Sequence, residues 1–312
     1  MSQASNKIRI GTRTSKLALA QVAEVHLLLA PYLENSQIEI VPITTSGDRI
    51  QDRNLSEVGG KGLFIKELEE ALTQNRIDIA VHSAKDVPPM LHEDTVLAAF
   101  TERLDTRDCF ISKKYDSLKK LPKGAIVGTS SARRKAILLL IRPDLKVVNF
   151  RGNVDTRLRK IEEGEVDAAI LALCGLTRLD KDLAVKQLIE KDVMLPAGGQ
   201  GSLAIQIRKS DKKNFELLQK INHQQTQIEV KCERAFLREL GASCCTPVGV
   251  NAVVDGDSLT LKTLLLDYDG SEIFETKSKG KADLEDALRL GIEAAKKAKN
   301  EAAKLLEKIC KN

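Results

Sequence analysis

The first 200 residues alternate short apolar runs with amphipathic stretches of helical period. The apolar runs predict strands at 7–11, 38–44, 77–81, 126–129, 146–150 and 166–171. The amphipathic stretches predict helices at 15–33, 62–75, 132–141 and 154–163. Because strands that alternate with helices are typical of βαβ units, we expect an α/β fold with parallel sheets.

This pattern occurs twice. Ile10-Gly11-Thr12 leads into a hydroxyl-rich helix start, and so does Val127-Gly128-Thr129. Residues 77–81 and 166–170 share the pattern x-Asp-x-Ala-x before a loop. Chance similarity between short turns is the alternative, but a duplication predicts two similar lobes that face each other across a ligand-binding cleft. The polar segment 47–62 is predicted to be a loop beside that site.

The pattern changes after residue 201. A strand at 203–207 and a helix at 214–221 are expected to return to one of the lobes. A helix, three strands joined by Asp-Gly turns and a closing helix then indicate an α+β domain, with elements at 228–240, 247–254, 258–267, 271–276 and 283–308. The predicted division is a first lobe at 1–101 and 200–221, a second lobe at 102–199, and an α+β domain at 222–312.

Composition narrows the class of protein. The 312 residues suit two or three domains, and 42% hydrophobic with 30% charged residues is ordinary for a globular protein. Aromatic residues make up only 3%, so a nucleic-acid site built on stacked aromatics is disfavoured. Apolar stretches fall short of the roughly 20 residues that a bilayer requires, and the first residues are polar. We therefore expect a cytoplasmic protein without a membrane partner.

Six cysteines show neither C-x-x-C nor zinc-ligand spacing, so no metal site is expected. Most of them are expected to pack as small apolar residues. Cys244 is the exception because it lies on a loop of small residues before Pro247, which makes it a candidate nucleophile or attachment point. Segments 59–62 and 198–201 are glycine-rich but miss the spacing of phosphate-binding motifs.

Basic residues gather at strand-to-helix turns, where Arg13, Arg133, Arg134, Arg151 and Arg157 lie. Basic side chains in a first turn oppose the helix dipole, so stability alone does not favour them there. Guanidinium groups beside helix N-termini suit a ligand with several carboxylates or phosphates. The alternative is an arginine face that is solvated or internally paired.

A polar segment, His82 to Pro89, follows a predicted buried strand. Lys85 could pair with an anionic group. Asp86 is a carboxylate able to stabilise a developing cation or to move a proton. An ordinary Lys85–Asp86 ion pair is the alternative.

Six motifs in order carry a resemblance to a known family. They are Ile10-Gly11-Thr12-Arg13-Thr14-Ser15, Gly59 to Phe64, His82 to Pro88, Gly128 to Arg134, Arg151 to Arg157, and Glu233-Arg234 leading to Cys244-Cys245-Thr246-Pro247. Each motif is weak alone, but the ordered set, from about residue 8 to 250, closely resembles the porphobilinogen deaminase family.

The resemblance implies a transferase of haem-type tetrapyrrole biosynthesis. Such an enzyme joins four porphobilinogen molecules head to tail, releases ammonia and frees linear hydroxymethylbilane. It carries a dipyrromethane cofactor on one cysteine through a thioether. The implied fold has two lobes like those of periplasmic binding proteins around a cleft, and a small α+β domain that carries the cysteine. A monomer without a nucleic-acid partner is expected.

The resemblance also assigns roles by position, and each fits a substrate whose pyrroles bear acetate and propionate groups. Asp86 is the implied catalytic residue. The implied cofactor-binding residues are Cys244, Lys85, Ser131, Arg133, Arg134 and Ser15. The implied substrate-binding residues are Arg13, Arg151, Arg157 and Arg178.

The sequence departs from the family pattern at the attachment loop. Ala242-Ser243 stands where Gly-Gly is usual, and a second thiol follows at once. Counting from Arg234 and back from Pro247 both favour Cys244, and Cys245 is the alternative attachment point.

Two other classes of protein remain as rivals at this stage. A two-lobed binding protein for a small anion would need no reactive cysteine and would be exported. A nucleic-acid-binding protein would rely on the lysine-rich last helix, but it lacks a basic face elsewhere.

Overall fold

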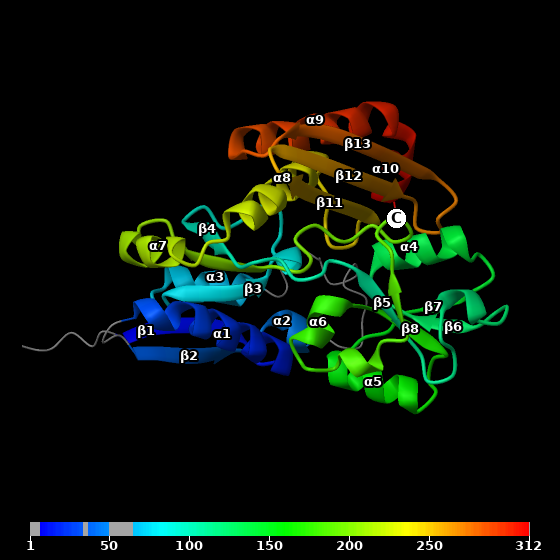
Figure 1. The fold of residues 1–312 in the computed structure, drawn as a ribbon, viewed down its shortest axis with the longest axis horizontal. Coiled ribbons are helices and arrows are strands. Elements are labelled where there is room, and N and C mark those ends of the chain that lie inside the picture. Colours follow the sequence, from blue (N-terminus) through cyan, green and yellow to red (C-terminus); the bar gives the residue numbers. More distant parts are fainter. Residues whose placement is uncertain (1–6, 34–36, 50–64, 312) are drawn as a thin grey trace, which may run out of the picture. The chain divides into compact units, whose positions relative to one another are not determined.

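The computed structural model of the chain describes residues 7–33, 37–49 and 65–311, and it forms two compact units (Figure 1). The first unit comprises residues 1–103 and 202–227, and the second comprises 104–201 and 228–312. The predicted division into three domains stays a prediction.

The first unit is built on a five-stranded mixed sheet with the order β2-β1-β3-β10-β4. Its strands are β1 (Lys7–Arg13), β2 (Gln37–Ile43), β3 (Ile79–Ser83), β4 (Thr95–Phe100) and β10 (Leu203–Arg208). Its helices are α1 (Lys16–Leu29), α2 (Ser46–Arg49), α3 (Lys66–Thr73) and α7 (Lys212–Gln219). β1 runs parallel to β2 and β3, whereas β10 runs antiparallel to β3 and β4.

Both faces of this sheet are buried, which follows from the alternation of side chains along a strand. Ile79 on β3 joins a core cluster with Val22 and Val25 of α1. The next residue, Ala80, joins a different cluster with Leu68 and Leu72 of α3. The sheet is therefore covered by helices on both sides, as the continuous apolar runs indicate.

The second unit contains a sheet of the same plan, with the order β7-β6-β8-β5-β9. Its strands are β5 (Asp108–Ile111), β6 (Ile126–Gly128), β7 (Lys146–Val148), β8 (Ala168–Ala172) and β9 (Gln187–Ile189), and its helices are α4 (Ala132–Ile141), α5 (Val154–Glu162) and α6 (Leu173–Thr177). β6 is parallel to β7 and β8, and β5 is antiparallel to β8 and β9.

The register of the two sheets confirms the predicted duplication. Gly11 on β1 pairs with Ala80 on β3, and Gly128 on β6 pairs with Ala169 on β8. The strands predicted within the first 200 residues pair in parallel as expected, but each sheet also includes one strand of opposite direction, so both sheets are mixed. β10 confirms the predicted return of the chain to a lobe, whereas β4, β5 and β9 were not predicted.

The C-terminal part of the second unit is a three-stranded antiparallel meander with helices. It consists of α8 (Gln224–Leu240), β11 (Val248–Asp255), β12 (Ser258–Leu266), β13 (Ile273–Lys281), α9 (Leu284–Glu301) and α10 (Ala303–Lys311). Its core joins Phe236 of α8, Leu261 of β12 and Ala294 of α9. The predicted closing helix is thus two helices that separate at Ala302.

The meander packs on the second lobe. Leu264 and Leu266 of β12 share a core cluster with Ile137 of α4. The buried carboxylate of Glu233 accepts hydrogen bonds from the backbone N–H groups of Gly199 and Ala252, each at 2.7 Å. These contacts join α8, the segment before β10 and β11 within one unit.

Other predicted boundaries shift for local reasons. α1 ends at Leu29 because Pro31 follows at the start of a short 3₁₀ turn. α2 occupies the start of the segment predicted as a loop, and residues 50–62 of that prediction lie outside the described ranges.

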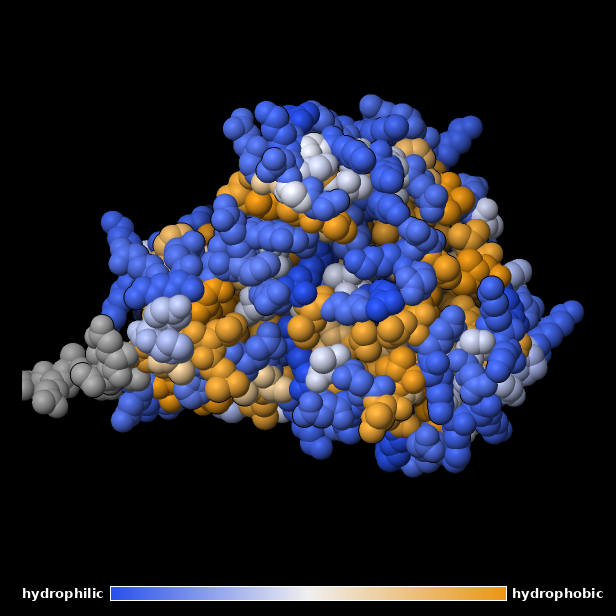
Figure 2. All heavy atoms as spheres, in the orientation of Figure 1, coloured by the Kyte–Doolittle hydropathy of each residue, from blue (hydrophilic) through white to orange (hydrophobic). Residues whose placement is uncertain are grey.

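The lysine-rich face of α9 is a solvated face. Lys296, Lys297 and Lys299 are exposed, whereas Ala294 and Ala298 on the opposite face are buried. Figure 2 shows hydrophilic residues covering the visible side of α9. Over the ranges that the structure describes, no helix has both the length and the apolar character needed to cross a membrane.

Candidate active site

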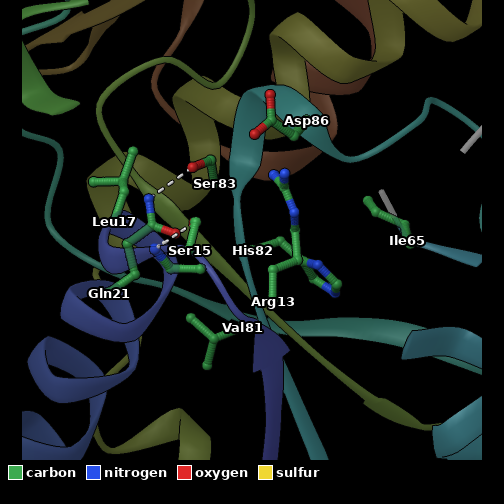
Figure 3. A pocket seen from close by; sticks show the side chains of 10 residues that line it. Arg13, Ser15, Leu17, Gln21, Ile65, Val81, His82, Ser83 and Asp86 are labelled. Atoms are coloured by element: carbon green, nitrogen blue, oxygen red, sulfur yellow. Dashed lines mark hydrogen bonds between the residues drawn. The ribbon is translucent and has the colours of Figure 1, made fainter. Parts of the chain in front are cut away.

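A pocket in the first unit collects several of the residues singled out from the sequence (Figure 3). Its lining residues come from β1, α1, β3, the turns that follow the two strands and the start of α3: Arg13, Ser15, Leu17, Ala18, Gln21, Ile65, Val81, His82, Ser83 and Asp86. Of the predicted residues, the structure therefore brings Arg13, Ser15 and Asp86 together. Lys85 lies beside Asp86 in the same turn and is half-buried.

The local sequence explains this placement. β1 ends at Arg13, and the Oγ of Ser15 accepts the N–H of Ala18 at 3.2 Å, which caps α1. β3 ends at Ser83, and a 3₁₀ turn over Ala84–Asp86 leaves the Asp86 side chain exposed. Parallel strands β1 and β3 are neighbours, so their carboxyl ends meet at one edge of the sheet.

Three polar pocket residues were not assigned a role from the sequence: Gln21, His82 and Ser83. The Gln21 side chain is buried and donates to the Ser83 hydroxyl at 2.7 Å. His82 is 5% exposed, and its Nε2 lies 2.9 Å from Oε1 of Gln206. A polar residue among the buried positions of a strand is the signal that could have identified His82.

The paired arginines of the second unit are buried rather than open. Arg133 and Arg134 are 4% and 7% exposed, and each Nη2 donates to a different oxygen of Asp108 at 2.7 Å. Their Nη1 groups donate to the carbonyls of Leu195 at 2.6 Å and Ile170 at 3.1 Å. The expectation of an internally paired arginine face therefore describes these two residues.

Asp108 is fully buried, and two arginines and an amide surround it. Burial alone would raise the pKa of its carboxyl, but the charges of Arg133 and Arg134 outweigh that effect and hold the pKa well below its ordinary value. Gln200 also donates to Asp108 at 2.9 Å. Neither Asp108 nor Gln200 was identified from the sequence, because no periodic or motif signal marks them.

The charges in this group do not cancel. Two guanidinium groups face one carboxylate, and among the described residues the Nε atoms of Arg133 and Arg134 are buried with no hydrogen-bond acceptor. An anionic group that accepts these N–H groups would balance the remaining positive charge.

The remaining predicted residues of the second unit occupy helix starts and turns. Ser131 caps α4, since its Oγ accepts the N–H of Arg134 at 3.4 Å. Arg151 and Arg157 lie on either side of Asn153, the cap of α5, and both are half-buried. Arg178 follows α6 and donates to the Gly201 carbonyl at 3.1 Å.

The loop with two cysteines begins where α8 ends. Gly241 has φ +76°, and the N–H groups of Gly241 and Ala242 bond to the carbonyls of Arg238 and Leu237. Only Gly241 takes the left-handed conformation here, so replacement of Gly-Gly by Ala242-Ser243 imposes no backbone strain.

Cys244 is exposed and Cys245 is half-buried, with their Sγ atoms 3.9 Å apart. By contrast, burial raises the pKa of Cys109 and of Cys232 to about 12, so these two thiols are poor nucleophiles at neutral pH. The side chains that the structure describes include no group of three or more His, Cys, Asp or Glu residues arranged to hold a metal ion.

Solved structures with a similar fold include two bacterial binding proteins. One is a periplasmic substrate-binding protein of an ABC transporter from Coxiella burnetii, with TM-score 0.44 and 17% identity over 69% of this chain and 90% of that chain. The other is a nutrient-binding protein from Burkholderia cenocepacia bound to methionine, with TM-score 0.42 and 16% identity over 68% and 89% of the two chains.

Sequence relatives are much closer. The porphobilinogen deaminase of Nitrobacter winogradskyi is 48% identical over 295 residues, which are 94% of this chain and 93% of that protein. The chloroplastic porphobilinogen deaminase of Oryza sativa subsp. japonica is 46% identical over 95% of this chain and 84% of that protein.

Two family descriptions match consecutive parts of the chain. "Porphobilinogen deaminase, dipyromethane cofactor binding domain" matches residues 8–216, and "Porphobilinogen deaminase, C-terminal domain" matches residues 227–300. The chain belongs to the porphobilinogen deaminase family.

Proposed function

We propose that the protein joins four porphobilinogen molecules head to tail, releases four ammonia molecules and frees hydroxymethylbilane by addition of one water. The observation that carries this proposal is 48% identity to a porphobilinogen deaminase over 94% of the chain. The described pocket and the buried arginines supply chemistry that suits this reaction. The activity is that of a transferase in haem-type tetrapyrrole biosynthesis.

The donor set fits a dipyrromethane cofactor, whose pyrroles carry carboxylates. Arg133 and Arg134 outnumber Asp108 in charge and keep buried Nε–H groups without an acceptor among the described residues. Ser131 and Ser15 retain hydroxyl hydrogens that can donate while their oxygens cap helices. We propose these residues, with Lys85, as the binding set for the cofactor carboxylates.

Cys244 is the proposed attachment residue. Its thiol is exposed on a loop that β11 and α8 hold at both ends, and this sulfur would hold the cofactor through a thioether to the methylene carbon of a deaminated pyrrole. The thiol proton passes to solvent or to the pyrrole. When bound, the cofactor supplies the free pyrrole carbon to which the first substrate is joined.

Asp86 is the proposed catalytic residue. Ammonia leaves with the electron pair of its C–N bond, so positive charge develops on the substrate pyrrole. The Asp86 carboxylate, exposed in the pocket, can stabilise that charge and accept the proton that the attacking ring carbon loses. Arg13, Arg151, Arg157 and Arg178 are the proposed partners of substrate acetate and propionate groups.

The expected monomer in the cytoplasm, without membrane or nucleic-acid partners, completes the proposal. Light scattering of the purified protein tests its oligomeric state.

Two measurements on freshly purified protein test the function. Its intact mass should exceed that of the bare chain by two porphobilinogen units less two ammonia molecules. Incubation with porphobilinogen should release one ammonia per substrate consumed and form hydroxymethylbilane. A bare-chain mass in active protein would contradict the covalent cofactor, and absence of turnover in protein that carries the adduct would contradict the reaction.

A further inference from the structure

A chain of hydrogen bonds leads from the buried His82 in the pocket wall to the half-buried Glu69 on α3. His82 Nε2 lies 2.9 Å from Gln206 Oε1, and Gln206 Nε2 donates to Glu69 Oε1 at 2.7 Å. Gln206 Nε2 also donates to Thr95 Oγ1 at 2.7 Å. Gln206 is fully buried, and Thr95 and His82 are 2% and 5% exposed.

The Glu69 carboxylate sets the direction of every bond in this chain. An ionised carboxylate only accepts, so the amide nitrogen of Gln206 must face Glu69 and the amide oxygen must face His82. The Thr95 hydroxyl donates to the His92 carbonyl at 3.0 Å and so accepts from the same nitrogen. His82 therefore carries its hydrogen on Nε2 when neutral, and Nδ1 is its acceptor nitrogen.

The second lobe shows that a lobe of this fold can form without these hydrogen bonds. By the shared register, Leu171 corresponds to His82 and Ile111 corresponds to Gln206, because Ile111 pairs with Ala169 as Gln206 pairs with Ala80. Leu158 corresponds to Glu69, since each lies nine residues before the aspartate that precedes the strand.

The three counterparts in the second lobe belong to one hydrophobic cluster. Buried polar groups stabilise a fold less reliably than apolar residues of similar volume. The lobe with the pocket nevertheless buries an amide and an imidazole and half-buries a carboxylate, where its twin has three aliphatic side chains in one cluster. This difference points to a role at the pocket rather than in folding.

We infer that Glu69 and Gln206 are positioning residues that hold His82 in one tautomer and orientation in the wall of the pocket that contains Arg13 and Asp86. The inference rests on the proposed function, because it concerns the efficiency of that reaction. An imidazole ring of fixed tautomer has one defined donor nitrogen and one defined acceptor nitrogen, whereas an unconstrained ring would sample two tautomers and several rotations.

The main test replaces Glu69, His82 and Gln206 by the residues at the corresponding positions of the second lobe. In the triple variant Glu69→Leu, His82→Leu, Gln206→Ile, we expect a folded protein with unchanged or higher Tm that still acquires the adduct mass. Its kcat should fall about 10- to 100-fold with a smaller change in KM, because geometry is lost rather than substrate binding. Gln219→Leu is the matched control, because it removes one 2.7 Å hydrogen bond to the Ala98 carbonyl in the same lobe and should leave kcat unchanged.

A second variant keeps the shape and tests the direction of the bonds. Glu69→Gln allows the Gln206 amide to turn over, so ¹⁵N NMR of His82 should show the proton shift from Nε2 toward Nδ1, and kcat should fall. Wild-type kcat in the triple variant would overturn the inference. Should the triple variant fail to fold, an unchanged His82 tautomer or kcat in Glu69→Gln would overturn it instead.

The two proposals fail in different ways. If the wild-type protein does not turn over porphobilinogen, the proposed function fails. The NMR measurement on the wild type is independent of turnover. A hydrogen on Nδ1 of His82 would by itself contradict the proposed role of Glu69 and Gln206.

Discussion

The two α/β lobes share strand order and register but bury different polar groups. In the first lobe an aspartate precedes β3 and accepts a hydrogen bond from β1, since Arg9 N–H donates to Asp78; in the second lobe an aspartate precedes β8 and accepts from β6, since Ile126 N–H donates to Asp167. The backbone bonds repeat as well, from Asp78 to Arg9 and from Asp167 to Ile126. These repeated positions are the ones that the fold requires.

Several positions that are not repeated carry residues proposed for binding or catalysis. Lys85 and Asp86 correspond to Cys174 and Gly175 in the second lobe. Asp108, the partner of the paired arginines, corresponds by register to Leu203 in the first lobe. The two capping serines are repeated in both lobes, so repetition alone does not separate structural from functional residues.

The comparison also suggests a division of labour between the units. The second unit contains the exposed cysteine and a buried group with excess positive charge, which suit it to hold an anionic cofactor. The first unit contains the pocket with Asp86, which suits it to turnover. The predictions below could break this division or sharpen it.

Cys244→Ser should have the largest effect, because the proposed attachment sulfur is lost. We expect complete loss of the adduct in intact-mass measurements and of hydroxymethylbilane formation. Cys245→Ser, 3.9 Å away at the sulfur, is the matched control and should keep both. The reverse result would move the attachment to Cys245.

Asp86→Ala should lower turnover without lowering the binding of pyrrole anions. Loss of the proposed acid–base group should lower kcat about 10²- to 10⁴-fold, while Tm and the capacity to bind pyrrole anions stay near wild type because Asp86 is exposed. Asp94→Ala removes another exposed carboxylate of the first unit and is the control. Full activity in Asp86→Ala would remove the catalytic role from the first unit.

Asp108→Asn should act through the stability of the second unit. Two buried arginines would lose their counter-charge, so the free energy of unfolding should fall by about 3–5 kcal/mol in denaturant titrations. Asp144→Asn is the control and should change the free energy of unfolding little, since the Arg142–Asp144 pair is partly exposed.

The same residue predicts a dependence on pH. Because the folded-state pKa of Asp108 is depressed, its stabilisation is present above the ordinary carboxyl pKa and is lost as the pH falls through the folded-state value. Wild type should therefore lose more stability on acidification than Asp108→Asn does. Parallel losses in the two proteins would contradict the buried ion pair.

Ser15→Ala and Ser131→Ala should have the smallest effects. Each removes one helix cap at an equivalent position in the two lobes, so each should lower the free energy of unfolding by about 0.5–2 kcal/mol. Slower acquisition of the adduct by either variant would support a role in cofactor binding. If both variants lose the same stability and acquire the adduct at the wild-type rate, both serines act only as helix caps.

Much of the fold could be predicted because its signals are short-range. The helix predicted at 132–141 has those bounds as α4, since Ser131 supplies the cap and Arg142-Pro143 ends the helix. Asp86 was found in the same way, because it follows directly on a recognisable strand. The motifs that carry the family resemblance are likewise contiguous.

What was missed depends on residues far apart in the chain. Asp108 pairs with arginines 25 and 26 residues away, and Gln206 contacts His82 across 124 residues. Nearly every residue of β4 and β5 is buried. These strands therefore lack the alternation of polar and apolar residues that marks a strand in the sequence.

The sequence by itself determined the duplicated α/β plan, the family and the candidates Asp86 and Cys244, because each depends on local propensity or on contiguous motifs. Only the tertiary structure decided that Arg133 and Arg134 are buried on Asp108 and that one strand of each sheet runs against the others. It also decided that the first lobe, and not the second, has a hydrogen-bonded polar group at these corresponding positions. The physical reason is that desolvation and ion pairing depend on what surrounds a side chain, and distant segments supply those surroundings.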